Sequence, residues 1–210
     1  MWAEKLGKQL GHPTQSVLGW LVSRFLTARN RILEEKAVQL CGIRPEDTVL
    51  ELGHGPGLGL QAAAKLLTEP TGHLIGVDYS AYMHQMASEQ MKELVASGKV
   101  TLHHCDVAAM PLAESTVDKV FHCNCYYFWP DLRKGATEIH RVMKPGGVMV
   151  TTLRLSNIVA FAAKRVFPGE NWRPETYMTA LRDSGFTDVR MEDTQHKDIT
   201  FQAIYATASK

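Results

Sequence analysis

The sequence predicts an α/β fold in which a mostly parallel sheet of seven strands carries helices on both faces. Between residues 46 and 154, short segments rich in β-branched residues alternate with segments whose apolar residues recur at helical spacing. Parallel neighbours need a crossover connection, so this order favours a parallel sheet. After residue 185, two strand-like segments follow each other without a helix, which predicts an antiparallel pair at one edge.

In chain order, the strands of the parallel part are expected at residues 48–53, 73–78, 99–106, 117–123 and 148–154. Helices are expected between them at 59–67, after a cap at Ser80, and at 131–143. The run Lys-Pro-Gly-Gly at 144–147 is expected to end the last of these helices, because proline cannot continue a helix and glycine tolerates the turn. A sheet of this kind binds its ligand at the carboxyl ends of the strands.

The two ends of the chain differ from this central part. A helix is expected at 174–184 and two strands at 187–193 and 198–208, with Gly185 ending the helix. The leader, residues 1–45, has apolar residues at helical spacing, which favours a helix packed on the body over a helix on a membrane surface. These apolar residues are Val17, Leu18, Leu21 and Phe25. We expect residues 1–210 to form one domain, with the leader as a lid and residues 46–210 as the core.

Composition narrows the class of protein and its partners. The 210 residues include 23 basic and 22 acidic side chains, and this balance disfavours nucleic acid as a partner. The N-terminus lacks the apolar core of a signal peptide, and its longest apolar run is too short to span a membrane. We therefore expect a cytoplasmic protein with its four cysteines reduced and with no metal site. The sequence leaves the oligomeric state open.

A glycine-rich loop follows the first expected strand and opens the first helix. It contains Gly53, Gly55 and Gly57, and glycines at such a turn let a ligand approach the backbone. The dinucleotide pattern G-x-G-x-x-G would require a further glycine where Leu58 or Leu60 stands. A nicotinamide-dependent oxidoreductase is therefore disfavoured, and a tight turn without a ligand is the structural alternative.

Two carboxylates stand at the ends of the next expected strands. Asp78 ends the second strand, where it can accept both hydroxyls of a ribose, or alternatively cap the following helix. Asp106 ends the third strand, where it can accept from an adenine amino group, or alternatively serve as a solvated turn residue. Suitable polar groups at three neighbouring strand ends are much less expected by chance than at any one, and this favours a nucleoside-binding site.

The segments ELGHGPG, GVDYS, CDVAAMPL and MKPGG resemble motifs of class I S-adenosylmethionine-dependent methyltransferases. They are most similar to the small "type 11" group, which resembles the methyltransferases of ubiquinone and menaquinone biosynthesis. The resemblance covers roughly residues 30–154. It implies a Rossmann-like sheet of order 3-2-1-4-5-7-6 with strand 7 antiparallel, and S-adenosylmethionine as the cofactor, with S-adenosylhomocysteine as its product.

The resemblance also implies which residues bind the cofactor. The expected set is Glu51, Gly53, Gly55, Gly57, Asp78, Tyr79, Asp106, Val107 and Asn124. The first four would contact the methionine part, Asp78 the ribose, and Asp106 with Val107 the adenine edge. Tyr79 would lie along the ribose or adenine. His54 departs from the family pattern, and we expect a solvated loop histidine without a role.

The segment HCNCYYFWPD at 122–131 leaves the fourth expected strand, and the resemblance implies that this corner lies beside the transferable methyl group. It matches the N-P-P-Y motif of amino-group methyltransferases only in part, so that chemistry is not carried over. Asn124 is expected to face the methionine part of the cofactor, and Tyr126 and Tyr127 to line the substrate pocket. Phe128 and Trp129 are expected to anchor the next helix.

Catalysis needs mainly in-line positioning and exclusion of water. We expect Tyr126 to act by positioning or by stabilising a cation with its aromatic face. A hydroxyl substrate would need a base, for which His122, His104 and Tyr126 are candidates, although structural histidines are favoured. Arg154 could meet an anionic substrate, or form a surface ion pair.

Two further features of the sequence concern the pocket. Residues 156–172 are a second candidate for a lid, after the leader. Cys123 and Cys125 are expected to fill the core rather than to bind a metalloid.

The sequence therefore predicts S-adenosylmethionine-dependent methyl transfer to a small, partly apolar molecule through a nitrogen, sulfur, oxygen or carbon atom. The alternatives are a methyltransferase for protein or RNA, and a catalytically silent partner that binds the cofactor.

Overall fold

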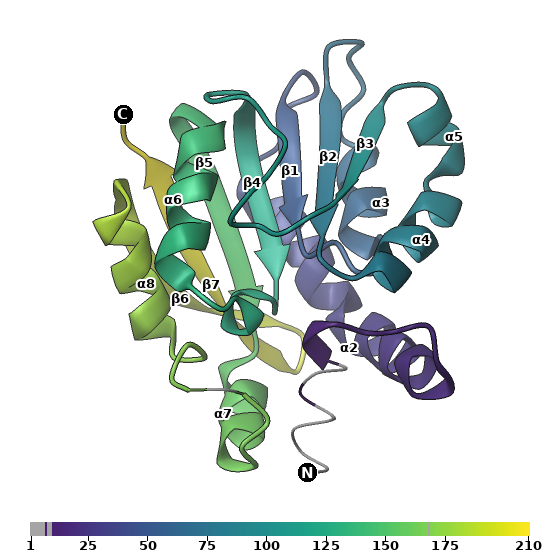
Figure 1. Cartoon of the computed structure of the whole chain (residues 1–210). Coiled ribbons are helices and arrows are strands. Elements are labelled where there is room, and N and C mark those ends of the chain that lie inside the picture. Colours follow the sequence, from purple (N-terminus) through teal and green to yellow (C-terminus); the bar gives the residue numbers. More distant parts are fainter. Residues whose placement is uncertain (1–6, 8–9, 168) are drawn as a thin grey trace.

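The computed structural model describes residue 7 and residues 10–167 and 169–210, and its centre is a seven-stranded sheet of order β3-β2-β1-β4-β5-β7-β6 (Figure 1). The strands are β1 (Thr48–Leu52), β2 (His73–Asp78), β3 (Val100–His104), β4 (Val117–Cys123), β5 (Met143–Leu153), β6 (Phe186–His196) and β7 (Ile199–Ala208). Strands β1 to β5 pair in parallel, and β7 is antiparallel to both of its neighbours. The predicted α/β fold and its strand order are confirmed.

Helices cover both faces of this sheet. They are α2 (Val17–Cys41), α3 (Leu58–Ala64), α4 (Ala81–Gln90), α5 (Lys92–Ala96), α6 (Leu132–Val142), α7 (Leu155–Ala163) and α8 (Pro174–Asp183), with a short 3-10 turn η1 (Tyr126–Phe128). Buried residues of α2, α3 and α4 form one cluster with the sheet, and those of α6 and α8 form another on the opposite face. The sheet is therefore the middle layer of three.

The strand sequences explain this layering. Along β1, Val49 belongs to the cluster under α2 and α3, whereas Leu50 and Leu52 belong to the cluster under α6. Successive side chains of a strand point to opposite faces, so a strand covered on both faces is apolar throughout. The same holds in β4, where Val120 and Phe121 divide between the two clusters.

Two local expectations need correction. Strand β5 begins at Met143, which pairs with Val117 before a shift in register, so the Lys-Pro-Gly-Gly run lies inside the strand rather than before it. Gly146 has φ 75°, which only glycine adopts readily, and this conformation accommodates the irregularity.

The leader helix is also placed differently. It packs through later residues, among them Leu33, Ala37 and Val38, while Leu21 is half exposed. The side chains of Val17, Leu18 and Phe25 lie outside the described residues.

The register brings four strand ends to one edge of the sheet. Leu52 of β1 pairs with Val77 of β2 and with His122 of β4, and Asp78 pairs with His104 of β3. Figure 1 shows α2 and α7 at the same edge. Within the described part of the chain, no helix is long and apolar enough to cross a membrane.

Candidate functional site

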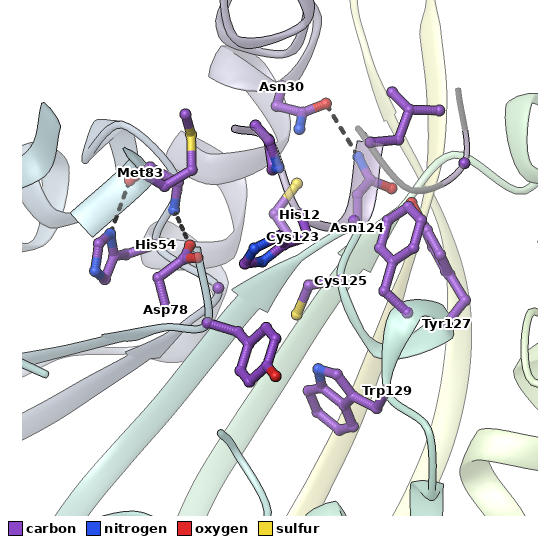
Figure 2. Close-up of a pocket in the computed structure, with 18 of the residues that line it drawn as sticks. His12, Asn30, His54, Asp78, Met83, Cys123, Asn124, Cys125, Tyr127 and Trp129 are labelled. Atoms are coloured by element: carbon purple, nitrogen blue, oxygen red, sulfur yellow. Dashed lines mark hydrogen bonds between the residues drawn. The ribbon is translucent and has the colours of Figure 1, made fainter. Parts of the chain in front are cut away.

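A cavity of about 830 Å³ lies at the carboxyl ends of β1 to β4 (Figure 2). Its floor consists of the strand-end loops, and its other walls come from the leader, including α2, and from the segment around α7. Cavities of roughly 300–1,000 Å³ are typical of sites for small molecules and cofactors. The strand ends therefore border a space of suitable size.

The glycine loop between β1 and α3 forms the part of the floor nearest the sheet. Gly53, Gly55 and Gly57 have φ values of 64°, 53° and 99°, which side chains adopt only with strain. The backbone N–H groups of Gly53 and His54 donate to the carbonyl oxygen of Val77, at 2.7 and 3.3 Å. These bonds bind the loop to the end of β2.

Asp78 links the glycine loop to the next helix. Its Oδ2 accepts the backbone N–H of Gly55 and its Oδ1 that of Ser80, each at 2.8 Å. The cap of α4 is Ser80 rather than Asp78, since the Ser80 hydroxyl accepts from Met83. A carboxylate has about four lone-pair sites, so both oxygens of Asp78 can still accept hydrogen bonds from a ligand.

The third strand end and the leader meet at one end of the cavity. Asp106 accepts the backbone N–H of Ala108 at 2.9 Å. Tyr79 is 61% exposed, and its ring centroid lies 5.2 Å from that of His12. The Ser80 hydroxyl donates to the Pro13 carbonyl at 2.6 Å, so the leader crosses this end of the site.

The fourth strand end is connected to the leader helix. Asn124 has a left-handed backbone, with φ 50°, which asparagine tolerates better than most residues. Its side-chain amide donates to Oδ1 of Asn30 on α2, at 3.2 Å, and Figure 2 shows this pair at the cavity. The loop after β4 and helix α2 therefore form one continuous wall.

Two buried carboxyl groups lie where these walls meet. Glu34 of α2 lines the cavity, whereas Glu51 of β1 lies behind it and does not. Oε2 of Glu34 and both oxygens of Glu51 are buried without a hydrogen-bond partner among the described residues. Burial raises the pKa of Glu34 to about 8, and burial together with the nearby Glu34 raises the pKa of Glu51 well above its usual value.

The histidine of the glycine loop is buried rather than solvated as expected. His54 is 2% exposed, and its Nδ1 donates to the carbonyl of Gly55 at 2.8 Å. Its Nε2 is buried and unpartnered in the described structure. Burial lowers the pKa of His54, so the ring is neutral at physiological pH and Nε2 is an acceptor.

Three thiols also line the cavity, those of Cys105, Cys123 and Cys125. Burial is the main cause that raises the pKa of each, so they stay protonated at neutral pH. The described residues contain no group of three histidine, cysteine or acidic side chains arranged to hold a metal ion.

The aromatic run divides differently from the prediction. Tyr126 is fully buried outside the cavity wall, where its hydroxyl donates to the Trp172 carbonyl at 2.9 Å and its ring stacks on Tyr177 at 4.3 Å. Tyr127, Phe128 and Trp129 line the cavity. The run forms a 3-10 turn with three residues per turn, so successive side chains point in different directions around its axis. Tyr126 therefore does not line the pocket, contrary to the expectation. Phe128 and Trp129, which were expected only to anchor the next helix, line the cavity as well.

The two candidate histidine bases do not line the cavity. His122 is fully buried, with Nε2 2.8 Å from both the Tyr177 hydroxyl and the Thr151 hydroxyl. Burial lowers the pKa of His122 to about 3. The Nε2 of His104 is bonded to the Tyr79 carbonyl at 2.9 Å. Neither histidine is placed to act as a base on a ligand in the cavity, and both have the structural role that the sequence analysis favoured.

The end of the cavity farthest from β3 is basic and apolar. Arg29, Arg154 and Arg165 line it, and Arg29 donates to Oδ1 of Asn157 on α7 at 3.3 Å. The Nε of Arg154 is buried without a partner among the described atoms. The neighbouring wall residues are Tyr127, Phe128, Ile158, Phe161, Val166 and Phe167.

Most of the predicted site residues meet in this one cavity. The wall includes Gly53, Gly55, Asp78, Tyr79, Asp106, Val107, Asn124, Tyr127 and Arg154. Glu51 and Gly57 are not part of the wall, and Tyr126 belongs to the core. The sequence interpretation missed Glu34, Asn30 and Arg29 in the leader. One signal was available, because Glu34 falls on the same helical stripe as Ala37 and Val38, where a charge is unusual.

Comparisons with known proteins agree with this geometry. Residues 49–147 match a family model described as a methyltransferase domain. The chain is 31% identical over 187 residues to the uncharacterized methyltransferase YdaC of Bacillus subtilis, covering 89% of this chain and 96% of that protein. It is 28% identical over 189 residues to the erythromycin 3''-O-methyltransferase of Saccharopolyspora erythraea, covering 81% and 60%. The crystal structure of a SAM-dependent methyltransferase from Aquifex aeolicus has the same fold, with a TM-score of 0.69 at 19% identity, covering 89% of this chain and 96% of that one.

Proposed function

This chain belongs to the family of S-adenosylmethionine-dependent methyltransferases, and we propose that it methylates a small, partly apolar molecule that carries an anionic group. The observation that carries the proposal is the polarity of the cavity. Strand-end carboxylates and the glycine loop lie at one end, and arginines with an aromatic wall lie at the other. The first end suits the cofactor and the second suits the acceptor.

The residues of the first end fit the cofactor. Buried, unpartnered atoms of Glu34 and His54 border the cavity, and a Cβ on Gly55 would meet only open space. We assign the cofactor site to seven residues, with Asp78 at the ribose, Asp106 and Val107 at the adenine, and Asn124 at the methionine part. These residues are Gly53, Gly55, Asp78, Tyr79, Asp106, Val107 and Asn124. Glu51 and Gly57 support this surface from behind.

When bound, S-adenosylmethionine supplies a methyl group on a positively charged sulfur that is a good leaving group. The protein's part is to hold the acceptor atom in line and to exclude water. Tyr127, Phe128 and Trp129 provide the aromatic wall for this purpose, and an aromatic face attracts a nearby cation by roughly 0.5–2 kcal/mol. In this proposal Tyr127 takes the role expected for Tyr126.

The arginines supply the specificity for an anion. No described residue forms a salt bridge with Arg154 or Arg165, although both line the cavity. An arginine presents a planar fork of donors that matches a carboxylate or phosphate. The leader and the α7 segment form walls of the cavity, which favours a small acceptor over a protein or RNA.

Labelled methyl transfer to matched acceptor pairs tests the proposal. Each pair contains a phenol, amine or thiol and the same compound with an added carboxylate, such as thiophenol and mercaptobenzoate. We expect kcat/KM to be at least about tenfold higher for the acid of at least one pair. In Arg154→Gln this preference should fall, whereas Arg31→Gln, an exposed residue of α2 outside the cavity wall, should keep it.

Equal rates for acid and neutral acceptors would contradict the anionic part of the proposal. Binding of S-adenosylhomocysteine without turnover of any acceptor would contradict the proposed acceptor class and favour a partner that only binds the cofactor.

A further inference from the structure

Glu34 is an acidic residue of the leader that lines the cavity with one oxygen, Oε2, left without a hydrogen-bond partner among the described residues. It is 7% exposed, and its Oε2 is buried with no hydrogen bond from any described residue. Buried polar atoms in proteins almost always have partners, so an exception on a cavity wall indicates a ligand that supplies one. An acidic oxygen in such a place suits a cationic donor.

Glu51 stands behind Glu34, on the side away from the cavity. A Cβ on Gly59 would collide with the Glu51 carboxyl group, so Glu51 is enclosed by helix α3 and not by the cavity. Glu34 interacts with Glu51 of β1 and Cys123 of β4, and both carboxyl groups are raised in pKa chiefly by burial. With a pKa of about 8, Glu34 is mostly protonated at pH 7 until a cation approaches.

The position of Glu34 along the sheet edge identifies this cation. The inference rests on the proposed function, which places adenine at the end of β3 and ribose at the end of β2. The remaining part of the cofactor, its amino-acid end, then reaches the ends of β1 and β4. Glu34 lies there, beside Cys123, and its α2 neighbour Asn30 is bonded to Asn124. The amino-acid end carries an ammonium group, and Glu34 is the acidic residue of the leader that lines the described cavity.

We propose that Glu34 binds the α-ammonium group of S-adenosylmethionine as a carboxylate, and that it releases its proton to solvent when the cofactor binds. No bond other than this O–H bond breaks in the step. The loss of this one proton gives Glu34 a single negative charge opposite the single positive charge of the ammonium group.

Calorimetric titrations with two ligands test the assignment. S-adenosylhomocysteine carries the amino-acid end, whereas 5′-methylthioadenosine has the adenosine and the thioether but no ammonium group. We expect Glu34→Gln to lower the affinity for S-adenosylhomocysteine by about tenfold or more and to leave the affinity for 5′-methylthioadenosine unchanged. Glu35→Gln is the matched control, because Glu35 is exposed on the same helix and should change neither affinity.

A second measurement follows the proton. Titrations at pH 7 in phosphate and in Tris, which differ in ionisation enthalpy, should show release of close to one proton per S-adenosylhomocysteine bound. The release should disappear in Glu34→Gln, and it should be absent for 5′-methylthioadenosine in the wild type.

The possible contrary results are distinct. An equal loss of affinity for both ligands in Glu34→Gln would mean that Glu34 only supports the fold of the site, and no loss for either would place the ammonium group elsewhere. Either result overturns the proposal. Failure of the wild type to bind either ligand would overturn the assigned cofactor site itself, and this proposal with it.

Discussion

At the scale of single residues, buried polar groups fall into two kinds. His122 is sealed in the core, with its Nε2 close to the hydroxyls of Tyr177 and Thr151. Glu34, His54 and Arg154 instead carry buried atoms without partners in the described structure, and all three line the cavity. A satisfied buried group contributes to stability, whereas an unsatisfied one on a cavity wall indicates recognition of a ligand.

The burial of His122 predicts a loss of stability in acid. Its pKa is about 3 in the folded protein and about 6.5 in an unfolded chain, so below pH 6.5 the unfolded state takes up the proton first. This stability is complete above pH 6.5 and is lost as the pH falls toward 3. Between pH 7 and pH 5, the free energy of unfolding should fall by about 2 kcal/mol more in the wild type than in His122→Gln.

Urea unfolding at the two pH values measures this difference. His196→Gln, in the edge strand β6, is the control and should lose as much stability as the wild type. An identical pH dependence in His122→Gln would show that His122 is not the group responsible.

At the scale of elements, the turn from β1 to α3 combines two demands. Its glycines hold backbone angles that side chains resist, and Gly55 at the same time borders the cavity. The turn is held by hydrogen bonds to Val77 and Asp78 at the end of β2. Gly55 therefore provides both the left-handed backbone conformation of the turn and free space at the cavity wall.

Gly55→Ala separates these two demands when it is compared with Gly98→Ala. Both glycines have positive φ values, 53° and 74°, and in both a Cβ would meet no atom within 4 Å. Each variant should lose about 1–2 kcal/mol of stability from backbone strain. Only Gly55→Ala should lower the affinity for S-adenosylhomocysteine, by about tenfold or more, because Gly98 is not part of the cavity wall.

Thermal unfolding and calorimetry of the two variants provide the measurements. The proposed site would be wrong if Gly55→Ala bound the ligand as well as Gly98→Ala.

At the scale of the whole molecule, two segments that lie far apart in the sequence, the leader and α7, border one site. The leader reaches the start of α4 through the Ser80 to Pro13 hydrogen bond, and Arg29 of α2 bonds to Asn157 of α7. Figure 1 shows these elements at the edge of the sheet where the strands β1 and β4 end. We propose that the leader and α7 act together as the lid over the core.

Hydrogen exchange with and without S-adenosylhomocysteine tests the lid. The ligand should slow exchange of backbone amides in residues 10–14 and 155–167 at least several-fold, because closure around the ligand suppresses local opening. The β6–β7 turn, around residues 196–199, lies outside the cavity wall and serves as the internal control. Protection confined to the glycine loop would show that the two segments do not close on the ligand.

Much of the fold was predictable because its signals are local. The glycine loop, the strand-end positions of Asp78 and Asp106, and the final antiparallel pair follow from strand and helix patterns in the sequence. The position of Tyr126 was not predictable, since a 3-10 turn changes the direction of each side chain and the sequence pattern does not specify that turn. The early start of β5 was missed for a similar reason, because its first pairing, with Val117, depends on a distant partner.

The sequence by itself determined the order of the elements and the strand ends that border the cavity, since both depend on spacing along the chain. Only the tertiary structure decided what surrounds those strand ends. Glu34, Asn30 and Arg29 belong to a helix far from the glycine loop in sequence, and they reach the cavity because α2 packs across the sheet beside α3, β4 and β5. Burial of Glu34 in this position is then the main cause that raises its pKa, which is an effect of the packed structure and not of the residue alone.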